Sequence, residues 1–307
     1  VRRAHPGEFS ERAVINGRLN LTQAEAISDL IGARSQKAAQ LAMTGISGDI
    51  NQKIHELRQQ LLDILSELEA RVDFEDELPP LNENDVVNDI VEIKESLQEL
   101  IDDSKRGAFV RNGLKVALIG LPNVGKSSLL NRLSKRERAI VTDLPGTTRD
   151  LLEVEIILDG VPLTLIDTAG IRESNNKVEQ LGIERSHEAL ISADVVMLIF
   201  DISIGWSNAD QKLLNQIPKN IPRVIVGNKS DMQFHSKNSE SRICFSALTG
   251  EGESDLIKSL LKACGASDIK NLKVALNERQ LDLAILAKAS LTRTHAMVKE
   301  KLPWDFW

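Results

Sequence analysis

The residues best suited to chemistry form a glycine-rich segment, GLPNVGKS, at residues 120–127. The segment fits the pattern G-x-x-x-x-G-K-[ST] and lies between a predicted strand, LKVALIG, and a predicted helix, SLLNRLS. Gly120 and Gly125 allow backbone N–H groups to face phosphate oxygens, and the helix N-terminus adds its dipole. Lys126 is expected to reach the β- and γ-phosphates, and the Ser127 hydroxyl to ligate Mg²⁺. The segment therefore predicts a nucleotide-binding P-loop.

A second motif, DTAG at residues 167–170, ends the predicted strand PLTLID. Asp167 could hold Mg²⁺ through a water molecule, and the Gly170 amide could sense the γ-phosphate. Between the two motifs, Thr147 and Thr148 of PGTTRD offer hydroxyl and carbonyl oxygens, the hard ligands that Mg²⁺ prefers. We expect the loop that carries them to close over the metal.

A third motif, NKSD at residues 228–231, predicts the choice of base. The Asp231 carboxylate can accept hydrogen bonds from N1–H and the exocyclic amino group of guanine, a donor pair that adenine lacks. Asn228 can hydrogen-bond near the base, and the stem of Lys229 can pack on its face. SAL at residues 246–248 would present an amide to the guanine O6. The predicted ligands are therefore GTP and GDP, with Mg²⁺.

The elements that must position these motifs are short β-rich runs alternating with helical ones. The runs are LKVALIG, EVEIILDG, VPLTLIDT, DVVMLIFDI, PRVIVGNK and RICFSA. Strands alternating with helices predict a mostly parallel sheet covered on both faces. A glycine-containing turn within VEIILDGVPLTLID predicts one antiparallel hairpin.

Helical patterns precede this α/β block. Thr22 and Glu25 have the spacing of a capping box that opens the helix LTQAEAISDLI. From Ser35 an apolar stripe with steps of three and four runs to about Phe74, which predicts one long helix. A further helix is predicted near residues 85–105.

The chain returns to helix after the α/β block, with Asn277 and Gln280 as a predicted N-terminal cap. We therefore predict a P-loop, Ras-like GTPase domain of α/β class, with a mostly parallel sheet, inserted into an all-α helical domain. Residues 1–113 form the first part of the helical domain, 114–268 the GTPase domain, and 269–307 the second helical part. Two separate helical domains would give the same pattern.

Composition narrows the class of protein. A formal net charge of −7 and a pI near 5.4 argue against a broad non-specific nucleic-acid surface, although a local basic site stays possible. Two cysteines, Cys244 and Cys264, are too few for a disulfide framework. No apolar run approaches the ~18–20 residues that a membrane span needs. We expect a cytoplasmic protein with no membrane contact.

The segments GLPNVGKSSLLN, PGTTRD and DTAGIRE resemble the signature shared by Era, EngA and MnmE/TrmE GTPases. PGEFSERAVINGRLNLTQAEAISDLI at residues 6–31 is similar to the start of the helical domain of the MnmE/TrmE tRNA-modification GTPases. The resemblance covers nearly the whole chain. It implies a GTP hydrolase that works with a flavoprotein partner of the MnmG/GidA type on C5 of the wobble uridine in tRNA.

The resemblance also implies how hydrolysis runs. Ras-like enzymes orient the attacking water with a glutamine, where this chain has Ile171, and an aliphatic side chain cannot align water. The family instead points to Glu179 and to a potassium ion held by the Asn123 side chain and by oxygens of the loop at residues 142–147. The family assembles this site when two GTPase domains meet, so a homodimer is expected to gate hydrolysis.

Two departures from the family stand out. Members carry a folate-binding domain before the segment at residues 6–31 and end in a cysteine-containing motif, and this chain shows neither. We therefore expect a fragment of a longer protein. Arg18, just inside the helical domain, is either a contact to a folate derivative or a solvated surface residue.

The predicted catalytic residues are Glu179, Lys126 and Thr148. The predicted cofactor contacts are Asn123, Val124, Gly125, Lys126, Ser127, Ser128, Thr142, Asp143, Leu144, Pro145, Gly146, Thr147, Thr148, Asp167, Thr168, Ala169, Gly170, Asn228, Lys229, Asp231, Ser246, Ala247, Leu248 and Arg18. The predicted metal ligands are Ser127 and Thr148 for magnesium, and Asn123, Thr142, Leu144 and Thr147 for potassium.

Two other functions remain open at the level of sequence. One is a ribosome-assembly GTPase of the Era or EngA type, although neither a KH-like RNA module nor a second GTPase domain is recognisable. The other is a GTP-dependent interaction switch that does not hydrolyse, which Ile171 makes reasonable. A turnover assay separates the switch from the enzyme.

Overall fold

The computed structural model describes residues 2–74, 78–79, 81–136, 152–167, 190–232, 243–267 and 269–300. The chain forms two compact units, one made of Val1–Ala108 with Asn271–Trp307 and the other of Phe109–Lys270. The second unit interrupts the first along the chain, as expected of a domain inserted into another. Among the helices in the described ranges, none is both long enough and apolar enough to span a membrane.

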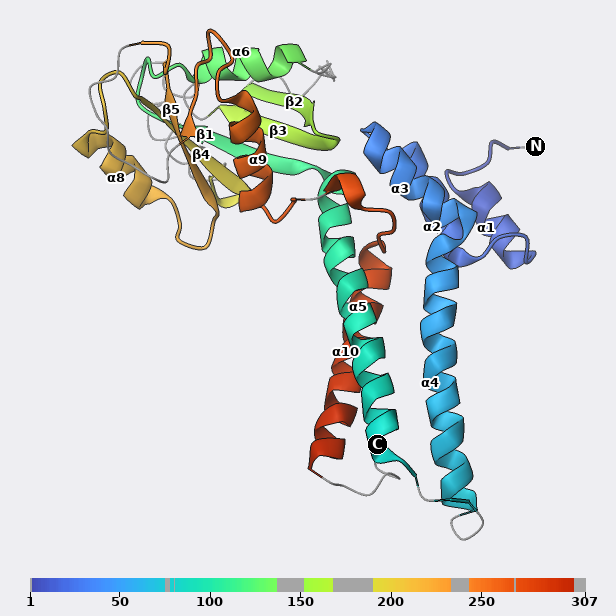
Figure 1. Cartoon of the computed structure of the whole chain (residues 1–307). Coiled ribbons are helices and arrows are strands. Elements are labelled where there is room, and N and C mark those ends of the chain that lie inside the picture. Colours follow the sequence, from blue (N-terminus) through green and yellow to red (C-terminus); the bar gives the residue numbers. More distant parts are fainter. Residues whose placement is uncertain are drawn as a thin grey trace. The chain divides into compact units, whose positions relative to one another are not determined.

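The inserted unit is built on a six-stranded sheet with the order β2-β3-β1-β4-β5-β6 (Figure 1). The strands are β1 (Leu114–Ile119), β2 (Leu152–Leu158), β3 (Val161–Asp167), β4 (Val195–Asp201), β5 (Arg223–Asn228) and β6 (Ile243–Cys244). All neighbouring pairs are parallel except β2 and β3, which are antiparallel. Asp159 and Gly160, with φ of 51° and 87°, form the turn between these two strands. The predicted fold class, with its hairpin, is confirmed.

The strands read as continuous apolar runs because helices cover both faces of the sheet. All seven residues of β4 are buried. The covering helices include α6 (Lys126–Arg136), α8 (Asn208–Gln216) and α9 (Glu253–Ala263). On one face, Ala117, Val196 and Leu198 pack in a cluster with Ile217, which directly follows α8. Helix α6 contacts β2 and β3, and α9 contacts β5. The sheet is thus a rigid platform whose strand ends can position loops.

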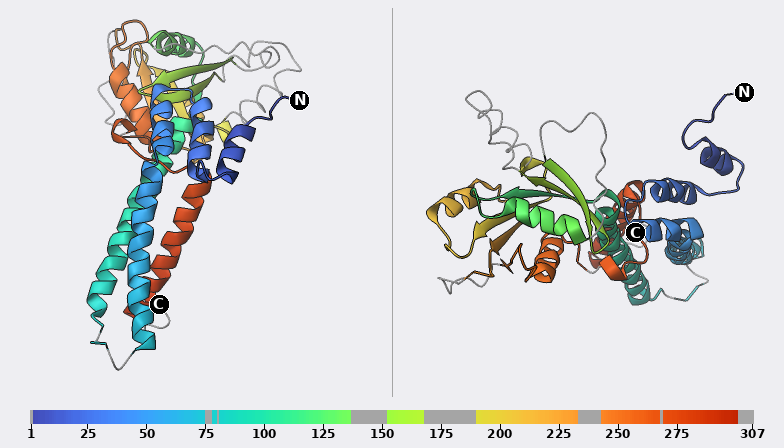
Figure 2. Two further views of the ribbon diagram at one scale, coloured as in Figure 1. Left: turned by 90° about the vertical axis from the view of Figure 1, so that its right-hand side faces the viewer. Right: turned by 90° about the horizontal axis from the view of Figure 1, so that it is seen from above.

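The helical unit has two parts, before and after the inserted unit. Its helices are α1 (Glu8–Ile15), α2 (Leu21–Ile31), α3 (Gln36–Ser47), α4 (Asp49–Asp73), the larger part of α5 (Glu83–Asn112) and α10 (Glu278–Lys299). A short 3₁₀ turn, η2 (Ile269–Asn271), lies where the chain passes back from the inserted unit. Figures 1 and 2 show α4, α5 and α10 running side by side. α5 begins two residues before the predicted helix at 85–105 and ends seven residues after it.

The prediction of one long helix from Ser35 to Phe74 is wrong, because the segment forms two helices that are separated at Gly48. This glycine has φ of 96° and lies between α3 and α4, and its N–H donates to the Thr44 carbonyl to close α3. A left-handed backbone at this point ends one helix and starts the next. The apolar stripe continues across the break, so periodicity alone could not reveal it.

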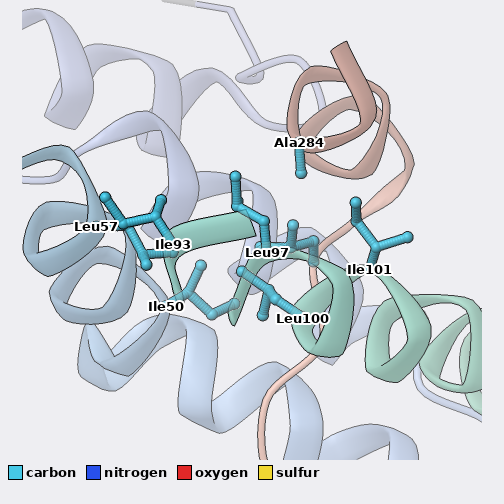
Figure 3. Packing of buried hydrophobic residues seen from close by; sticks show 8 residues of the cluster. Ile50, Leu57, Ile93, Leu97, Leu100, Ile101 and Ala284 are labelled. Carbon is cyan, nitrogen blue, oxygen red and sulfur yellow. The ribbon is translucent and has the colours of Figure 1, made fainter. Parts of the chain in front are cut away.

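The core of the helical unit lies between α4, α5 and α10 (Figure 3). Its buried members are Ile50, Leu57, Ile93, Leu97, Leu100, Ile101, Leu276 and Ala284. Leu61, Ile64 and Leu281 pack against this cluster from α4 and α10. Burial of these side chains joins residues from the two sequence halves of the unit, which explains why the helices form together.

The cap of α2 differs from the prediction. Asn20, not Thr22, is the N-cap: its Oδ1 accepts from the Gln23 N–H at 2.8 Å, and Gln23 Oε1 accepts from the Asn20 N–H at 3.1 Å. Both pairs have the spacing of a capping box, but the backbone is extended at Asn20 and already helical at Thr22. The cap predicted for α10 is confirmed, since Asn277 and Gln280 form the same reciprocal pair.

Glu25 has a different role from the capping one that the sequence suggested. Its carboxylate accepts hydrogen bonds from Arg279 Nε at 2.6 Å, Asn277 Nδ2 at 2.7 Å and Gln280 Nε2 at 2.8 Å. The bond from Arg279 lowers the pKa of Glu25, and burial opposes this change. One carboxylate on α2 therefore holds the N-terminal cap of α10.

This arrangement predicts that Glu25→Gln lowers the free energy of unfolding by about 1 kcal/mol near neutral pH, because the charge-assisted bonds are lost. The folded pKa of Glu25 lies below its ordinary 4.5, so the stabilisation is present above that value and is lost as pH falls through the folded pKa. Urea unfolding of both proteins at pH 7 and pH 3 measures the effect.

Glu56→Gln is the matched control, because exposed Glu56 accepts from the Gln52 amide on its own helix. We expect it to change stability little at either pH. A difference between the wild-type protein and Glu25→Gln that is the same at pH 3 and pH 7 would contradict a role for the charge.

Candidate functional site

The P-loop connects the end of β1 to the start of α6 in the inserted unit (Figure 1). Asn123 and Gly125 both have positive φ, 63° and 94°. A Cβ added at Gly125 would lie 2.2 Å from Asn228 Nδ2, so the loop passes too close to β5 for any other residue. These constraints turn the loop around the N-terminus of α6, where backbone N–H groups and the helix dipole favour anions.

Lys126 occupies the first turn of α6 and is buried. Its Nζ donates to the carbonyl oxygens of Gly120 at 2.9 Å and Leu121 at 2.8 Å. The loop thus holds the ammonium group against its own backbone carbonyls, at the N-terminus of α6. Ser127 and Ser128, which follow on the helix, are exposed. The predicted phosphate contacts at residues 123–128 therefore come together in one turn of the chain.

Asp167 ends β3 at the same edge of the sheet. Its side chain is 3% exposed, and it pairs in register with Leu118 of β1, two residues before the P-loop begins at Gly120. The carboxyl ends of neighbouring parallel strands meet at one edge, so Asp167 lies beside the phosphate loop. A buried carboxylate and an exposed serine hydroxyl are oxygen ligands that suit a hydrated Mg²⁺. In the described ranges, no group of three or more His, Cys, Asp or Glu could hold a metal by itself.

Asn228 links the P-loop at residues 120–127, the phosphate loop, to the loop at residues 246–248 with its predicted base contacts, the guanine loop. It is 1% exposed at the end of β5. Its Nδ2 donates to the Val124 carbonyl at 2.8 Å, and its Oδ1 accepts from the Ala247 N–H at 3.0 Å. The amide was expected to hydrogen-bond near the base, and in the structure both of its ends join loops that carry predicted contacts. Removing it would take this partner away from the carbonyl of buried Val124 and from the N–H of half-buried Ala247.

Asp231 and Ser246 meet beside this link. The Ser246 hydroxyl donates to the Asp231 carboxylate and accepts from the Thr249 N–H. The Ser230 N–H donates to the Phe245 carbonyl at 3.1 Å. This bond joins the loop after β5 to the loop after β6. Asp231 stays exposed, as does Leu248, while Ala247 is half-buried. The structure brings together the predicted base contacts from the ends of β5 and β6.

Two residues of this region were missed by sequence reasoning. Asp201, at the end of β4, accepts from Lys229 Nζ at 2.6 Å. Burial raises the pKa of this carboxyl, but the hydrogen bonds from Lys229 and Ser203 bring it below its ordinary value. The sequence signal that could have identified it is an acidic residue directly after the apolar run VVMLIF.

Arg132 of α6 is the second missed residue. Its guanidinium donates to the carbonyls of Leu248 at 3.4 Å and Thr249 at 3.2 Å, and pairs with Glu253 at 3.4 Å. The helix that follows the phosphate loop therefore also supports the loop at residues 246–248. Nothing in the local sequence indicates this contact.

Several predicted residues lie outside the described part of the chain. They are Thr142, Asp143, Leu144, Pro145, Gly146, Thr147, Thr148, Thr168, Ala169, Gly170, Ile171 and Glu179. Their predicted roles stay predictions. Arg18 is described: it is exposed between α1 and α2 in the helical unit.

The family model of the MnmE helical domain matches residues 21–307 of this chain. The chain is similar to a tRNA modification GTPase MnmE from Prochlorococcus marinus, with 60% identity over 100% of this chain and 68% of that protein. It is 59% identical to an MnmE of the same description from a Synechococcus species, with the same coverage. Among solved structures, an Era protein of Aquifex aeolicus bound to GDP·AlF4⁻ is 30% identical, covers 49% of this chain and 56% of its own, and has a TM-score of 0.40.

The close approach at Gly125 predicts that Gly125→Ala weakens GDP binding by roughly tenfold or more, because the new Cβ must displace the Asn228 amide from Val124. Titration with a fluorescent GDP analogue measures the change.

Gly205→Ala is a matched control, since Gly205 has a similar φ of 88° but no atom within 4 Å of the added Cβ. It should cost about 1 kcal/mol of stability through backbone strain and leave GDP affinity unchanged. Equal affinities of the two variants would contradict the proposed contact.

Proposed function

Since the chain belongs to the MnmE family of tRNA modification GTPases, we propose that its inserted domain hydrolyses GTP in a potassium-stimulated reaction gated by contact between two such domains. The observation that carries the nucleotide assignment is the Asn228 side chain, which joins the Val124 carbonyl of the phosphate loop to the Ala247 N–H of the guanine loop. One buried residue thus couples the phosphate motif to the base motif. The fold and the family both agree with a GTP hydrolase.

The residues at the sheet edge fit a magnesium ion. Ser127 and Asp167 are the described candidates, and we propose Thr148 as a further ligand. When bound, Mg²⁺ would neutralise charge on the phosphates. The chain's own part would be to supply these oxygens and the charge of Lys126, whose ammonium group is held within the loop by the Gly120 and Leu121 carbonyls.

The water-orienting group is proposed to be Glu179, because Ile171 stands where Ras-like enzymes have glutamine. Asn123 is proposed to ligate potassium together with oxygens of residues 142–147. Its side chain is exposed and projects from a left-handed backbone, which leaves it accessible to a cation at the mouth of the loop. A monovalent cation in this position would act as an arginine finger does.

The biological reaction follows from the family. We propose that the protein acts with a flavoprotein of the MnmG/GidA type on C5 of the wobble uridine in tRNA, in the cytoplasm and as a homodimer. The helical domain, assigned to residues 1–113 and 269–307, would carry the GTPase domain at 114–268. Arg18 is a proposed contact to a folate derivative. Its exposure in the described part leaves its guanidinium accessible to such a ligand.

GTP turnover by the purified chain with Mg²⁺ should be roughly tenfold faster in KCl than in NaCl at matched ionic strength. Asn123→Gly removes the side chain without backbone strain, because Asn123 has φ of 63°. The variant should lose the potassium stimulation and keep GDP affinity. Phosphate release measures turnover.

Undiminished potassium stimulation in Asn123→Gly would remove this residue from the site. Slow turnover that is indifferent to the cation in the unchanged chain would contradict the potassium mechanism. No turnover at all, with GTP bound, would favour the interaction switch over the enzyme.

The base assignment predicts that Asp231→Asn shifts preference from GTP towards XTP, because the amide can donate to the xanthine O2 where the carboxylate accepts from guanine. We expect at least a roughly tenfold change in the ratio of kcat/KM values. Ser246, which shares a hydrogen bond with Asp231, provides the control: Ser246→Ala should weaken both nucleotides alike. An unaltered preference in Asp231→Asn would refute the assignment.

A further inference from the structure

An ion pair joins Asp201, the last residue of β4, to Lys229, the residue that follows β5. Asp201 is 8% exposed, and its Oδ2 accepts from Lys229 Nζ at 2.6 Å. Its other oxygen, Oδ1, accepts from the N–H of Ser203 at 3.0 Å and from the hydroxyl of Ser203 at 2.6 Å. The carboxylate is thus fixed by its neighbour and presents one oxygen to the lysine.

Lys229 is constrained from both ends. Its backbone has φ of 68°, in the left-handed region that a side chain rarely adopts. Asn228 before it is locked into the phosphate and guanine loops, and the Met232 N–H donates to the Lys229 carbonyl at 3.1 Å. With its ammonium group held by Asp201, the four-carbon stem has few positions left. The side chain remains about one-third exposed, so part of it faces solvent.

A free lysine has many rotamers, and most would not lie along a purine ring. Ordering the side chain before a ligand arrives removes that cost from the binding step. The strained backbone at Lys229 supports the same conclusion. Such a conformation persists only where the surrounding contacts hold it in place. Strain and ion pair together indicate a side chain set in place for a ligand.

We propose that Asp201 is a positioning residue for guanine-nucleotide binding: its carboxylate holds the Lys229 ammonium so that the lysine stem lies ready against the face of the base. The inference rests on the base site proposed above. Asp201 touches no nucleotide in this scheme and acts through Lys229. It therefore affects affinity for every nucleotide that stacks there, and the choice among bases stays with Asp231.

The test is Asp201→Asn, an isosteric change that keeps an oxygen for Ser203 and removes the charge that holds Lys229. The Kd for GDP should rise roughly five- to tenfold, mainly through faster dissociation, and kcat at saturating GTP should change less than about twofold. Stopped-flow release of a fluorescent GDP analogue and steady-state turnover give the two readouts.

Asp210→Asn is a closely matched control. Asp210 is 3% exposed, and one of its oxygens accepts from the N–H of Ser207 at 2.9 Å and from the hydroxyl of Ser207, as Asp201 does from Ser203. Its other oxygen, Oδ1, is buried and bonds to no lysine within the described part of the chain. Asp210→Asn should leave GDP release unchanged.

A double-mutant cycle with Lys229→Met isolates the coupling, because methionine keeps the apolar stem and lacks the ammonium. Asp201→Asn should have little further effect on GDP release in that background. Unchanged release in the single variant, equal acceleration in Asp210→Asn, or full additivity in the cycle would each overturn the inference. If the unchanged chain bound no guanine nucleotide, the proposed function itself would fail, which distinguishes the two failures.

Discussion

The amide of Asn228 holds the candidate site together, because one side chain satisfies a carbonyl of the phosphate loop and an N–H of the guanine loop. The two partners are the backbone carbonyl of Val124 and the backbone N–H of Ala247. Both residues are predicted to contact the nucleotide. Since the amide is almost fully buried, neither bond can be replaced by solvent without opening the structure. A Cβ at Gly125 would collide with the same amide, so the loop needs glycine where it passes β5.

The parallel sheet makes this link possible. β1, β3, β4 and β5 run in the same direction, so their carboxyl ends meet at one edge and bring together residues from distant parts of the chain. Asp167, Asp201 and Asn228 are the last residues of their strands. Each is a polar side chain at the end of an apolar run, and each is buried. Asp201 and Asn228 are neighbours in register, and Lys229, which follows Asn228, donates to the Asp201 carboxylate.

The helical unit also brings together distant parts of the chain, since the whole inserted domain separates its first and last segments in the sequence. Apolar packing between α4, α5 and α10 joins them, and polar contacts set where α10 begins. Glu25 holds the cap of α10, and the hydroxyl of Ser104 accepts from the Leu276 N–H at 2.9 Å. Lys37 Nζ donates to the Leu272 carbonyl at 2.9 Å on the approach to that helix. These hydrogen bonds tie the first turn of α10 and the segment before it to α2, α3 and α5, in addition to the apolar contacts.

Local patterns were sufficient to predict much of this protein. The P-loop, the NKSD motif, the hairpin and the cap at Asn277 each depend on a few consecutive residues whose backbone and hydrogen-bonding needs are met nearby. Competing local signals were harder: the spacing of Thr22 and Glu25 matched a capping box as well as that of Asn20 and Gln23 did, and an apolar stripe concealed the break at Gly48. Only the tertiary structure decided that Asn228 bridges two loops, that Arg132 supports the guanine loop and that Asp201 holds Lys229. Those contacts join residues far apart in the chain, and no single stretch of sequence encodes the geometry that brings them within hydrogen-bonding distance.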